Sequence, residues 1–464
     1  MQNNFNFTNL LKDITTQLDH KNARSGVISI CNQIPYFDLL SNYDYLQNQY
    51  SFSAIWEEKN NMSFLALDKC KYITLDGAGR FEMAKNFYYE NIKNLIYINE
   101  KSNYASLAKI IYFFSFADNL NKTANSSDVP NMEAVLPKIL IINDSGKSWI
   151  RFNAQFNNRS SIRQILEEFW MICNKLISLQ SNPEENNINI NMSEFDNAFN
   201  QSKKMMIKNI SKAVQLIEDK KIEKIVLSSR LNFQLDNKLN LNIILKKLKN
   251  NQNNSCIYLW SRNSRDITFG ASPEKLFSIK NNKLTLEAIA GTASSKLNND
   301  LILNNNKNLR EHKFVLNYLI NALKKLKINN FQKSDLQVKR FGNILHLYTF
   351  INASVKKVCP FELLENLHPS PAVCGIPKNN AFEWIQTLEV FSRGNYASPI
   401  GWVDVAGNSD FRVAIRGARY LNKEIQLTAG AGLVKDSKCI EEVEEIKLKF
   451  QAIANQIFPS KIIQ

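Results

Sequence analysis

The sequence predicts an α+β protein, a layered sandwich of antiparallel sheets with flanking helices. Two observations support this prediction. Short runs of apolar and β-branched residues, separated by Asn, Lys and Gly turns, dominate residues 1–195, which is typical of antiparallel strands. Apolar residues also recur every three or four positions in residues 195–219, 308–325 and 440–458, which indicates helices that bury one face.

The expected strands are short and closely spaced. In the first part of the chain they cover residues 26–30, 53–56, 62–67, 72–75, 109–116, 135–142 and 149–153. In the second part they cover residues 224–229, 341–354, 400–404 and two further strands that end at residue 434.

The pattern also predicts a division of the chain into two parts. We expect an N-terminal part of antiparallel strands over residues 1–195 and a second part over residues 196–464. Residues 180–191 contain Asn and Pro and almost no apolar cluster, so they are expected to connect the two parts over the surface.

The positive charge of the chain makes nucleic acid a partner to consider. The formal charge is +15, and a basic protein can bind nucleic acid by neutralising its phosphates. However, the lysines are scattered among asparagines along the whole sequence, without a zinc finger, an aromatic RNA-binding signature or a basic arm. We therefore expect no nucleic-acid partner.

Cysteine use and hydropathy bear on location. Seven cysteines without a C-x-x-C pair argue against a disulfide framework or structural zinc and suit a reducing cytosol. The longest apolar runs are far shorter than the roughly 18 residues that a membrane span requires. The N-terminus lacks the hydrophobic core of a signal peptide. We expect a cytoplasmic protein, monomeric or homodimeric, without a membrane segment.

Residues 367–404 differ in composition from the rest of the chain. Three prolines exclude a helix interior or a central strand over residues 369–377, so an ordered loop is expected there. Apolar residues every three positions predict a helix over residues 379–391, followed by Gly394 after its C-cap and a strand at residues 400–404. A loop held between regular elements often carries the polar contacts of a small-molecule site.

This stretch resembles the chorismate-binding enzymes, and among them most closely the isochorismate synthases. The family pattern is Leu-His-Pro-Thr-Pro-Ala-Val-x-Gly-x-Pro, a helix, and Glu-x-Phe-x-Arg-Gly-x-Tyr-Ala-Gly-x-x-Gly-Trp. This chain follows it from Leu367 to Trp402 except at Ser370 and Ser398, and the similarity extends over residues 200–457. The resemblance implies the layered α+β fold of the anthranilate synthase large subunit. It also implies that chorismate and water give isochorismate without a redox cofactor.

Two residues are candidates for acid-base chemistry. Lys224 begins a strand candidate and Glu274 follows a Ser-Pro pair, patterns that by themselves describe a solvated strand end and a turn. The resemblance implies that Lys224 is the general base toward water and that Glu274, in a Gly-Ala-Ser-Pro-Glu block, is the catalytic acid. Such roles require a lowered lysine pKa and a raised carboxyl pKa.

Three glutamates are candidates for metal binding. Glu311 precedes an apolar helix face, and Glu442 and Glu445 share one helical face with Lys449. Exposed Glu and Lys pairs on a helix are usually only solvated. The resemblance implies instead that Glu311 and Glu445 hold Mg²⁺, which prefers hard oxygen ligands, with Glu442 as a close partner. Asn308 stands where many relatives carry a fourth acid.

Arg416 is the main candidate for binding an anionic substrate. Residues 411–416 alternate, so Arg412 and Arg416 are expected to face one way along a strand, where one arginine is usually a surface charge. The resemblance implies instead that Arg416 binds a substrate carboxylate, which its guanidinium fork suits. The sequence Ala-Gly-Ala-Gly at residues 429–432 predicts a turn, and it lacks the third glycine and following helix of a dinucleotide-binding fingerprint. It resembles the Ala-Gly-Ala-Gly block of the family, which implies that its backbone amides can approach a carboxylate. The chorismate-binding residues implied by the resemblance are Gly291, Thr292, His346, Ala372, Tyr396, Arg416, Gly430, Gly432 and Lys449.

Several alternatives stay open at the level of sequence. Salicylate synthases are similar but typically carry Thr in place of Ala372. The aminating enzymes that make anthranilate or aminodeoxychorismate typically lack a lysine at the position of Lys224. A basic nucleic-acid-binding protein is the alternative from another class. The sequence does not identify whether the isochorismate would supply menaquinone, siderophore or salicylate synthesis.

Overall fold

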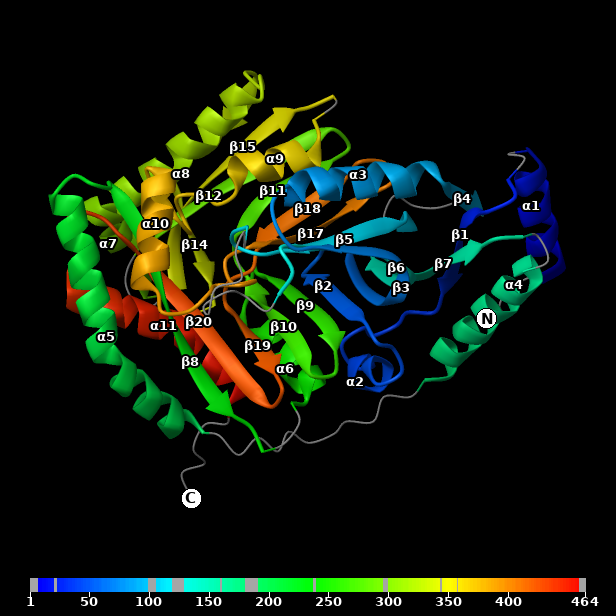
Figure 1. Ribbon diagram of the computed structural model, residues 1–464, viewed down its shortest axis with the longest axis horizontal. Helices are drawn as coiled ribbons and strands as arrows, with labels where there is room; N and C mark the ends of the chain where they lie inside the picture. Colours follow the sequence, from blue (N-terminus) through cyan, green and yellow to red (C-terminus); the bar gives the residue numbers. More distant parts are fainter. Residues whose placement is uncertain are drawn as a thin grey trace.

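The computed structural model describes residues 7–20, 23–98, 106–118, 129–158, 161–179, 191–236, 239–294, 299–342, 344–356 and 358–458 (Figure 1). Its helices are α1 (Phe7–His20), α2 (Tyr43–Gln47), α3 (Arg80–Lys93), α4 (Ile162–Ser178), α5 (Met192–Glu218), α6 (Leu241–Asn251), α7 (Asn299–Leu303), α8 (Asn306–Lys325), α9 (Pro360–Leu367), α10 (Lys378–Leu388) and α11 (Cys439–Ile457).

Its strands up to the middle of the chain are β1 (Gly26–Ile34), β2 (Ser53–Glu58), β3 (Ser63–Leu75), β4 (Leu95–Ile98), β5 (Lys109–Phe114), β6 (Met132–Asp144), β7 (Lys147–Phe156), β8 (Lys224–Gln234), β9 (Cys256–Asn263) and β10 (Asp266–Ser272). The remaining strands are β11 (Lys275–Lys280), β12 (Lys283–Ser294), β13 (Phe331–Lys333), β14 (Gln337–Phe341), β15 (Ile344–Ser354), β16 (Gly375–Ile376), β17 (Pro399–Asp404), β18 (Ser409–Val413), β19 (Gly417–Leu421) and β20 (Glu424–Leu433).

Antiparallel pairing connects the strands, as predicted. The pairs that carry most of the candidate site are β8 with β20 and β12 with β15, whereas β1 and β4 run parallel. Strands of the two parts of the chain also pair directly, β5 with β17 and β2 with β9. The sheet therefore continues across residue 195, and the division into two domains there stays a prediction. Residues 180–190 of the expected connection lie outside the described residues.

Two strand predictions are wrong in detail. The strands expected at residues 62–67 and 72–75 are one strand, β3, because a register shift at Lys69 and Lys71 lets it continue along β6. The turn expected at residues 429–432 is part of β20, which pairs residue by residue with β8. A Cβ at Gly430 would lie 2.5 Å from the Leu227 carbonyl oxygen, so the small residues there serve close strand packing.

The helix predicted at residues 379–391 is α10, and it ends at Leu388 instead. Glu389 adopts an extended backbone, and its carboxylate accepts hydrogen bonds from β8 and from Arg393. Gly394 is therefore not the residue after the C-cap, although its φ of +54° lies in the left-handed region that favours glycine. The ordered loop at residues 369–377 is confirmed, and it contains only the two-residue strand β16.

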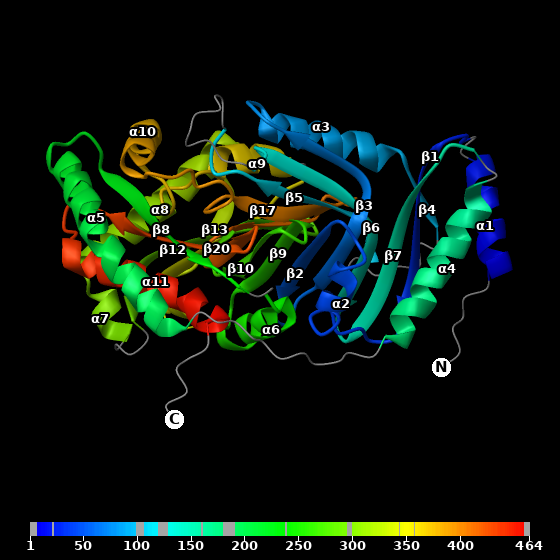
Figure 2. The ribbon, with the colours of Figure 1, turned by 60° about the horizontal axis from the view of Figure 1, so that its bottom comes forward.

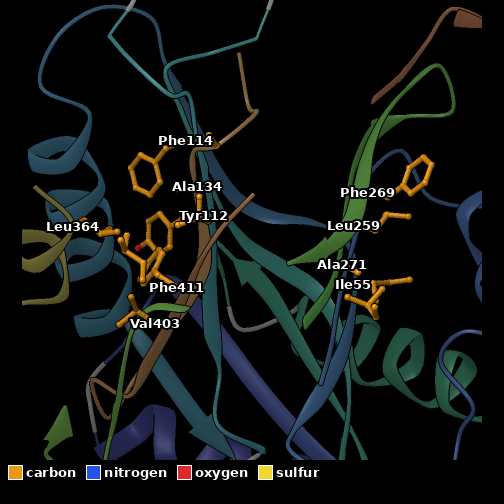
Figure 3. Close-up of a cluster of buried hydrophobic side chains, with 14 of the residues drawn as sticks. Ile55, Tyr112, Phe114, Ala134, Leu259, Phe269, Ala271, Leu364, Val403 and Phe411 are labelled. Atoms are coloured by element: carbon orange, nitrogen blue, oxygen red, sulfur yellow. The ribbon is translucent and has the colours of Figure 1, made fainter. Parts of the chain in front are cut away.

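The hydrophobic core crosses the boundary between the two parts of the chain. In Figure 3, Tyr112 and Phe114 of β5 face Phe411 of β18, with Leu364 of α9 beside them. The ring centroids of Tyr112 and Phe114 lie 6.2 Å and 6.5 Å from that of Phe411. This packing fixes the N-terminal strands against β17 and β18, which follow the loop at residues 369–377.

Helices α5 and α11 cover the sheet at β8 and β20, and both views place them at the same end of the molecule (Figures 1 and 2). Phe195 and Phe199 of α5 pack against Phe450 of α11, with centroid distances of 6.4 Å and 6.2 Å. Lys449 therefore faces β20, where its Nζ donates to the Gly430 carbonyl oxygen at 2.9 Å. Among the described residues, no helix combines the length and apolarity that a membrane span needs.

Candidate active site

One cavity brings together most of the residues predicted for the site. Strands β12, β15 and β20 contribute to its wall, as do α8, α11 and the loop at residues 369–377. The predicted residues that line it are Glu274, Gly291, Thr292, Glu311, His346, Ala372, Tyr396, Arg416, Gly430, Gly432 and Lys449. Lys224, Glu442 and Glu445 are not in the lining, but Lys224 contacts Glu311 and Glu445 contacts Lys449.

Lys224 is buried at the start of β8, so the reading as a solvated strand end is wrong. Its Nζ donates to Oε1 of Glu311 at 2.9 Å. Gly432 of the paired strand leaves room for this contact, because a Cβ there would overlap Oε1 of Glu311 and lie 3.2 Å from Cε of Lys224. The ammonium group is therefore held at the cavity wall, behind a carboxylate that faces the cavity.

Glu274 lies between β10 and β11 and faces the same cavity. Burial raises the pKa of its carboxyl to about 7, although three nearby cations oppose the shift. Its backbone amide donates a hydrogen bond to Oγ of Ser272 at 3.3 Å. The expectation of a carboxyl group that keeps its proton near neutrality agrees with this environment.

Arg416 and His346 form a second feature of the cavity. Nδ1 of His346 lies 3.1 Å from the Gly291 carbonyl oxygen, which can only accept, so Nδ1 carries the proton. Nε2 then accepts from Nη2 of Arg416 at 3.4 Å. Burial, followed by the charge of Arg416, lowers the pKa of His346 to about 3, which keeps the ring neutral.

The predicted strand position of Arg416 is wrong. Strand β18 ends at Val413, and Arg416 has a φ of +54°, so it does not share a face with Arg412. Arg412 is paired with Asp410 at 2.8 Å and with Glu58 at 2.9 Å, away from this cavity. Within the described chain, no carboxylate lies at ion-pair distance from the buried Arg416, which leaves its charge available for an anionic ligand.

Glu442 and Glu445 of α11 form an acidic cluster that is paired with lysines. Glu445 Oε1 accepts from Lys449 at 2.8 Å, and Lys307 lies 2.6 Å from Glu442 and 3.5 Å from Glu445. Burial alone would raise the pKa of Glu445, but Lys449 and Lys307 outweigh it and hold the pKa at about 2. Burial and the charge of Glu445 raise the pKa of Glu442 to about 7.

The acidic side chains that the structure describes do not converge closely enough to coordinate one metal ion together. Among the described residues, no group of three or more His, Cys, Asp or Glu side chains is arranged to hold a metal ion. Glu441 and Glu444 of the same helix are exposed and lie outside this cluster.

Sequence reasoning missed two features of the site. Lys307 stands one helical turn before Glu311 on α8, and this i, i+4 spacing was the available signal. Glu389 and Arg393 have the same spacing and form a buried ion pair with Nη2 and Oε1 2.6 Å apart. Both residues belong to the motif quoted above, but the sequence alone does not show what they contact.

The comparisons with known proteins define the class of the chain. The sequence profile described as "Chorismate binding enzyme" matches residues 11–458. The chain therefore belongs to the family of chorismate binding enzymes.

Particular relatives within the family are isochorismate synthases. The chain is 32% identical over 260 residues to isochorismate synthase MenF of Bacillus subtilis, covering 54% of this chain and 55% of that protein. It is 33% identical over 250 residues to MenF of Haemophilus influenzae, covering 52% and 57%. The matched segments thus span little more than half the length of these relatives.

Solved structures confirm the predicted fold. The structure of MenF, the menaquinone-specific isochorismate synthase from Escherichia coli, matches with a TM-score of 0.74 at 20% identity, covering 97% of this chain and 99% of that one. Anthranilate synthase component I from Streptococcus pneumoniae matches with a TM-score of 0.64 at 20% identity, covering 86% and 93%. These likenesses establish the architecture.

Proposed function

We propose that the protein is an isochorismate synthase, which converts chorismate to isochorismate. The observation that carries the proposal is that a proton donor, a guanidinium cation and a buried amine lie at one cavity. Glu274, whose pKa is raised to about 7, and Arg416, which lacks a carboxylate partner among the described residues, both face the cavity, and the buried Lys224 stands at its wall. The similarity to the two MenF proteins supports the same reaction.

The proposed reaction exchanges one hydroxyl position for another. Lys224 acts in its neutral amine form, after it has released its ammonium proton, and accepts a proton from the water molecule that forms a bond to C2 of the ring. Glu274, in its acid form, donates a proton to the hydroxyl that leaves C4. One water enters and one leaves, so chorismate and isochorismate have the same composition. Arg416 and Tyr396 hold the enolpyruvyl carboxylate, and the neutral His346 keeps the Arg416 guanidinium in place.

Magnesium is the cofactor we propose, and the donor set fits it. Among the described residues, both oxygens of the buried Glu442 lack a hydrogen bond, and Oε1 has an ion-pair partner, Lys307 at 2.6 Å. Hard carboxylate oxygens are the ligands that Mg²⁺ prefers. Glu311 and Glu445 would hold the ion, with Glu442 beside them. When bound, Mg²⁺ supplies a positive charge that neutralises the ring carboxylate of the substrate.

The product distinguishes this function from its neighbours. Purified protein incubated with chorismate and Mg²⁺ should yield isochorismate by chromatography, with little pyruvate in a lactate dehydrogenase coupled assay, and excess chelator should stop the reaction. Ala372 in the cavity wall is smaller than the Thr typical of salicylate synthases, and we propose that it lets isochorismate leave before pyruvate is expelled. Stoichiometric pyruvate and salicylate, or unchanged chorismate, would contradict the proposal.

The pH dependence of the reaction should report Glu274. Because burial raises the pKa of this carboxyl to about 7, its acid form is present below that pH and disappears above it. We expect kcat/KM to fall with a slope of about one log unit per pH unit above pH 7, since kcat/KM reflects groups of the free enzyme. The residual activity of Glu274→Gln should lack this limb. A limb of the same position in Glu274→Gln would assign it to another group.

Cytoplasmic location, and a monomeric or homodimeric state, stay predictions from the sequence. The pathway that would use isochorismate also stays open, because menaquinone, siderophore and salicylate synthesis all begin with this reaction.

A further inference from the structure

Lys307 lies at the centre of the acidic cluster. It is in the first turn of α8, one turn before Glu311, and its Nζ lies 2.6 Å from Oε1 of Glu442 and 3.5 Å from Oε2 of Glu445. Its side chain is only 16% exposed. One ammonium group thus bridges two carboxylates that come from another helix.

The charge of Lys307 is stabilised by the same three residues that we propose for the metal. Burial alone would lower its pKa, but Glu445, Glu442 and Glu311 outweigh burial and raise it. The carboxylate of Glu442 is buried without a hydrogen-bond partner, so its ion pair with Lys307 is the contact that offsets its burial. The lysine is therefore a cation in the position where a metal would be attracted.

The cluster is electrically balanced without a metal when Glu442 is ionised. Three carboxylates contact three ammonium groups, so a divalent cation adds charge unless one ammonium group moves away. The residues of this count are Glu311, Glu442, Glu445, Lys224, Lys307 and Lys449.

Of the three lysines, Lys307 can move away from the carboxylates most easily. Lys224 is fully buried, and Lys449 is also tied to the Gly430 carbonyl oxygen at 2.9 Å. Lys307 instead follows Asn304, Asn305 and Asn306, which are all exposed, so a change of its side-chain rotamer leads toward solvent.

We propose that Lys307 is a built-in counter-cation of the metal site, which holds the carboxylates of α11 in the metal-free protein and is displaced when Mg²⁺ binds. The inference rests on the proposed function only through the metal ligands. Its consequence is that Lys307 weakens the affinity for Mg²⁺, while it stabilises the fold when Mg²⁺ is absent.

Magnesium binding to the full chain tests this role without any measurement of activity. Isothermal titration with MgCl₂ should show about tenfold or greater tightening for Lys307→Met, because the ion no longer displaces a paired ammonium group. Lys313→Met is the matched control, since Lys313 is an exposed lysine of the same helix, and it should bind like the wild type. Lys307→Arg keeps the charge and should also keep the weaker affinity.

Thermal unfolding gives a second readout. In excess chelator, Lys307→Met should melt below the wild type, since Glu442 loses its ion-pair partner and Glu445 keeps only Lys449. MgCl₂ should raise the melting temperature of this variant more than that of the wild type. If Lys307→Met does not fold, Lys307→Gln takes its place in both measurements, because its amide is polar but carries no charge. Equal or weaker Mg²⁺ affinity in the neutral variants would overturn the proposal.

The outcomes separate this inference from the proposed function. A wild type that makes isochorismate, together with neutral variants that bind Mg²⁺ no more tightly, contradicts only the role of Lys307. Failure of every form to bind Mg²⁺ contradicts both this role and the proposed cofactor, whereas the product of chorismate still decides the reaction.

Discussion

Replacing Glu274 by Gln or Lys224 by Met should lower kcat by about 10²–10⁴-fold with a smaller change in KM, because each removes a proton transfer needed in the transition state. Glu274 is the cavity carboxyl whose pKa is raised to about 7, and Lys224 is the buried amine at the cavity wall. Steady-state rates of isochorismate formation over a range of chorismate concentrations separate the two parameters.

The controls separate chemistry from folding. Lys224→Met also removes the partner of Glu311, so its melting temperature must be measured, and rates must be taken well below it. Lys221→Met changes an exposed lysine just before the same strand and should leave kcat unchanged. Turnover at the wild-type rate by folded Lys224→Met or Glu274→Gln would remove that residue from the proposed mechanism.

The sequence predicted which residues gather at the cavity better than it predicted their contacts. Motif similarity selected Glu274, Arg416 and Tyr396, and all three line the cavity. The motif could not show that Lys224 is bonded to Glu311, because the two residues are 87 positions apart and meet only after β8 and α8 pack. Ion pairs of this kind depend on tertiary structure, which local patterns do not encode.

Local reasoning failed where a backbone feature interrupts a regular pattern. The alternation at residues 411–416 predicted one strand, but the left-handed backbone of Arg416 turns its side chain toward His346. The apolar spacing at residues 379–391 predicted a longer helix, whereas hydrogen bonds to the Glu389 carboxylate favour an extended residue at that point. In both places a tertiary contact outweighs the local preference.

The ion pair of Glu389 and Arg393 explains how the motif holds the site together. Arg393 donates to Glu389 and also to the carbonyl oxygens of Val373 and Val226, at 2.7 Å and 2.8 Å. Glu389 in turn accepts from the backbone amide of Ser228 at 2.7 Å and from its Oγ at 2.8 Å. One buried network thereby joins β8, the loop at residues 369–377 and the segment that leads to Tyr396.

Removing one of the two charges of this ion pair should lower the stability of the fold. Arg393→Met or Glu389→Gln should lower the free energy of unfolding by about 3–5 kcal/mol, because each leaves the partner charge buried and unpaired. The midpoint of urea unfolding, followed by circular dichroism, measures the loss. The double variant should lose less than the sum of the two single losses, since no lone charge remains.

The chain offers a matched control with the same residue types and spacing. Arg163 and Glu167 are also an i, i+4 pair, with a distance of 3.1 Å, but their side chains are 74% and 50% exposed. Arg163→Met or Glu167→Gln should cost about 0–1 kcal/mol, because water screens an exposed pair. Equal losses at the two pairs would show that burial does not set the strength of the Glu389 and Arg393 contact.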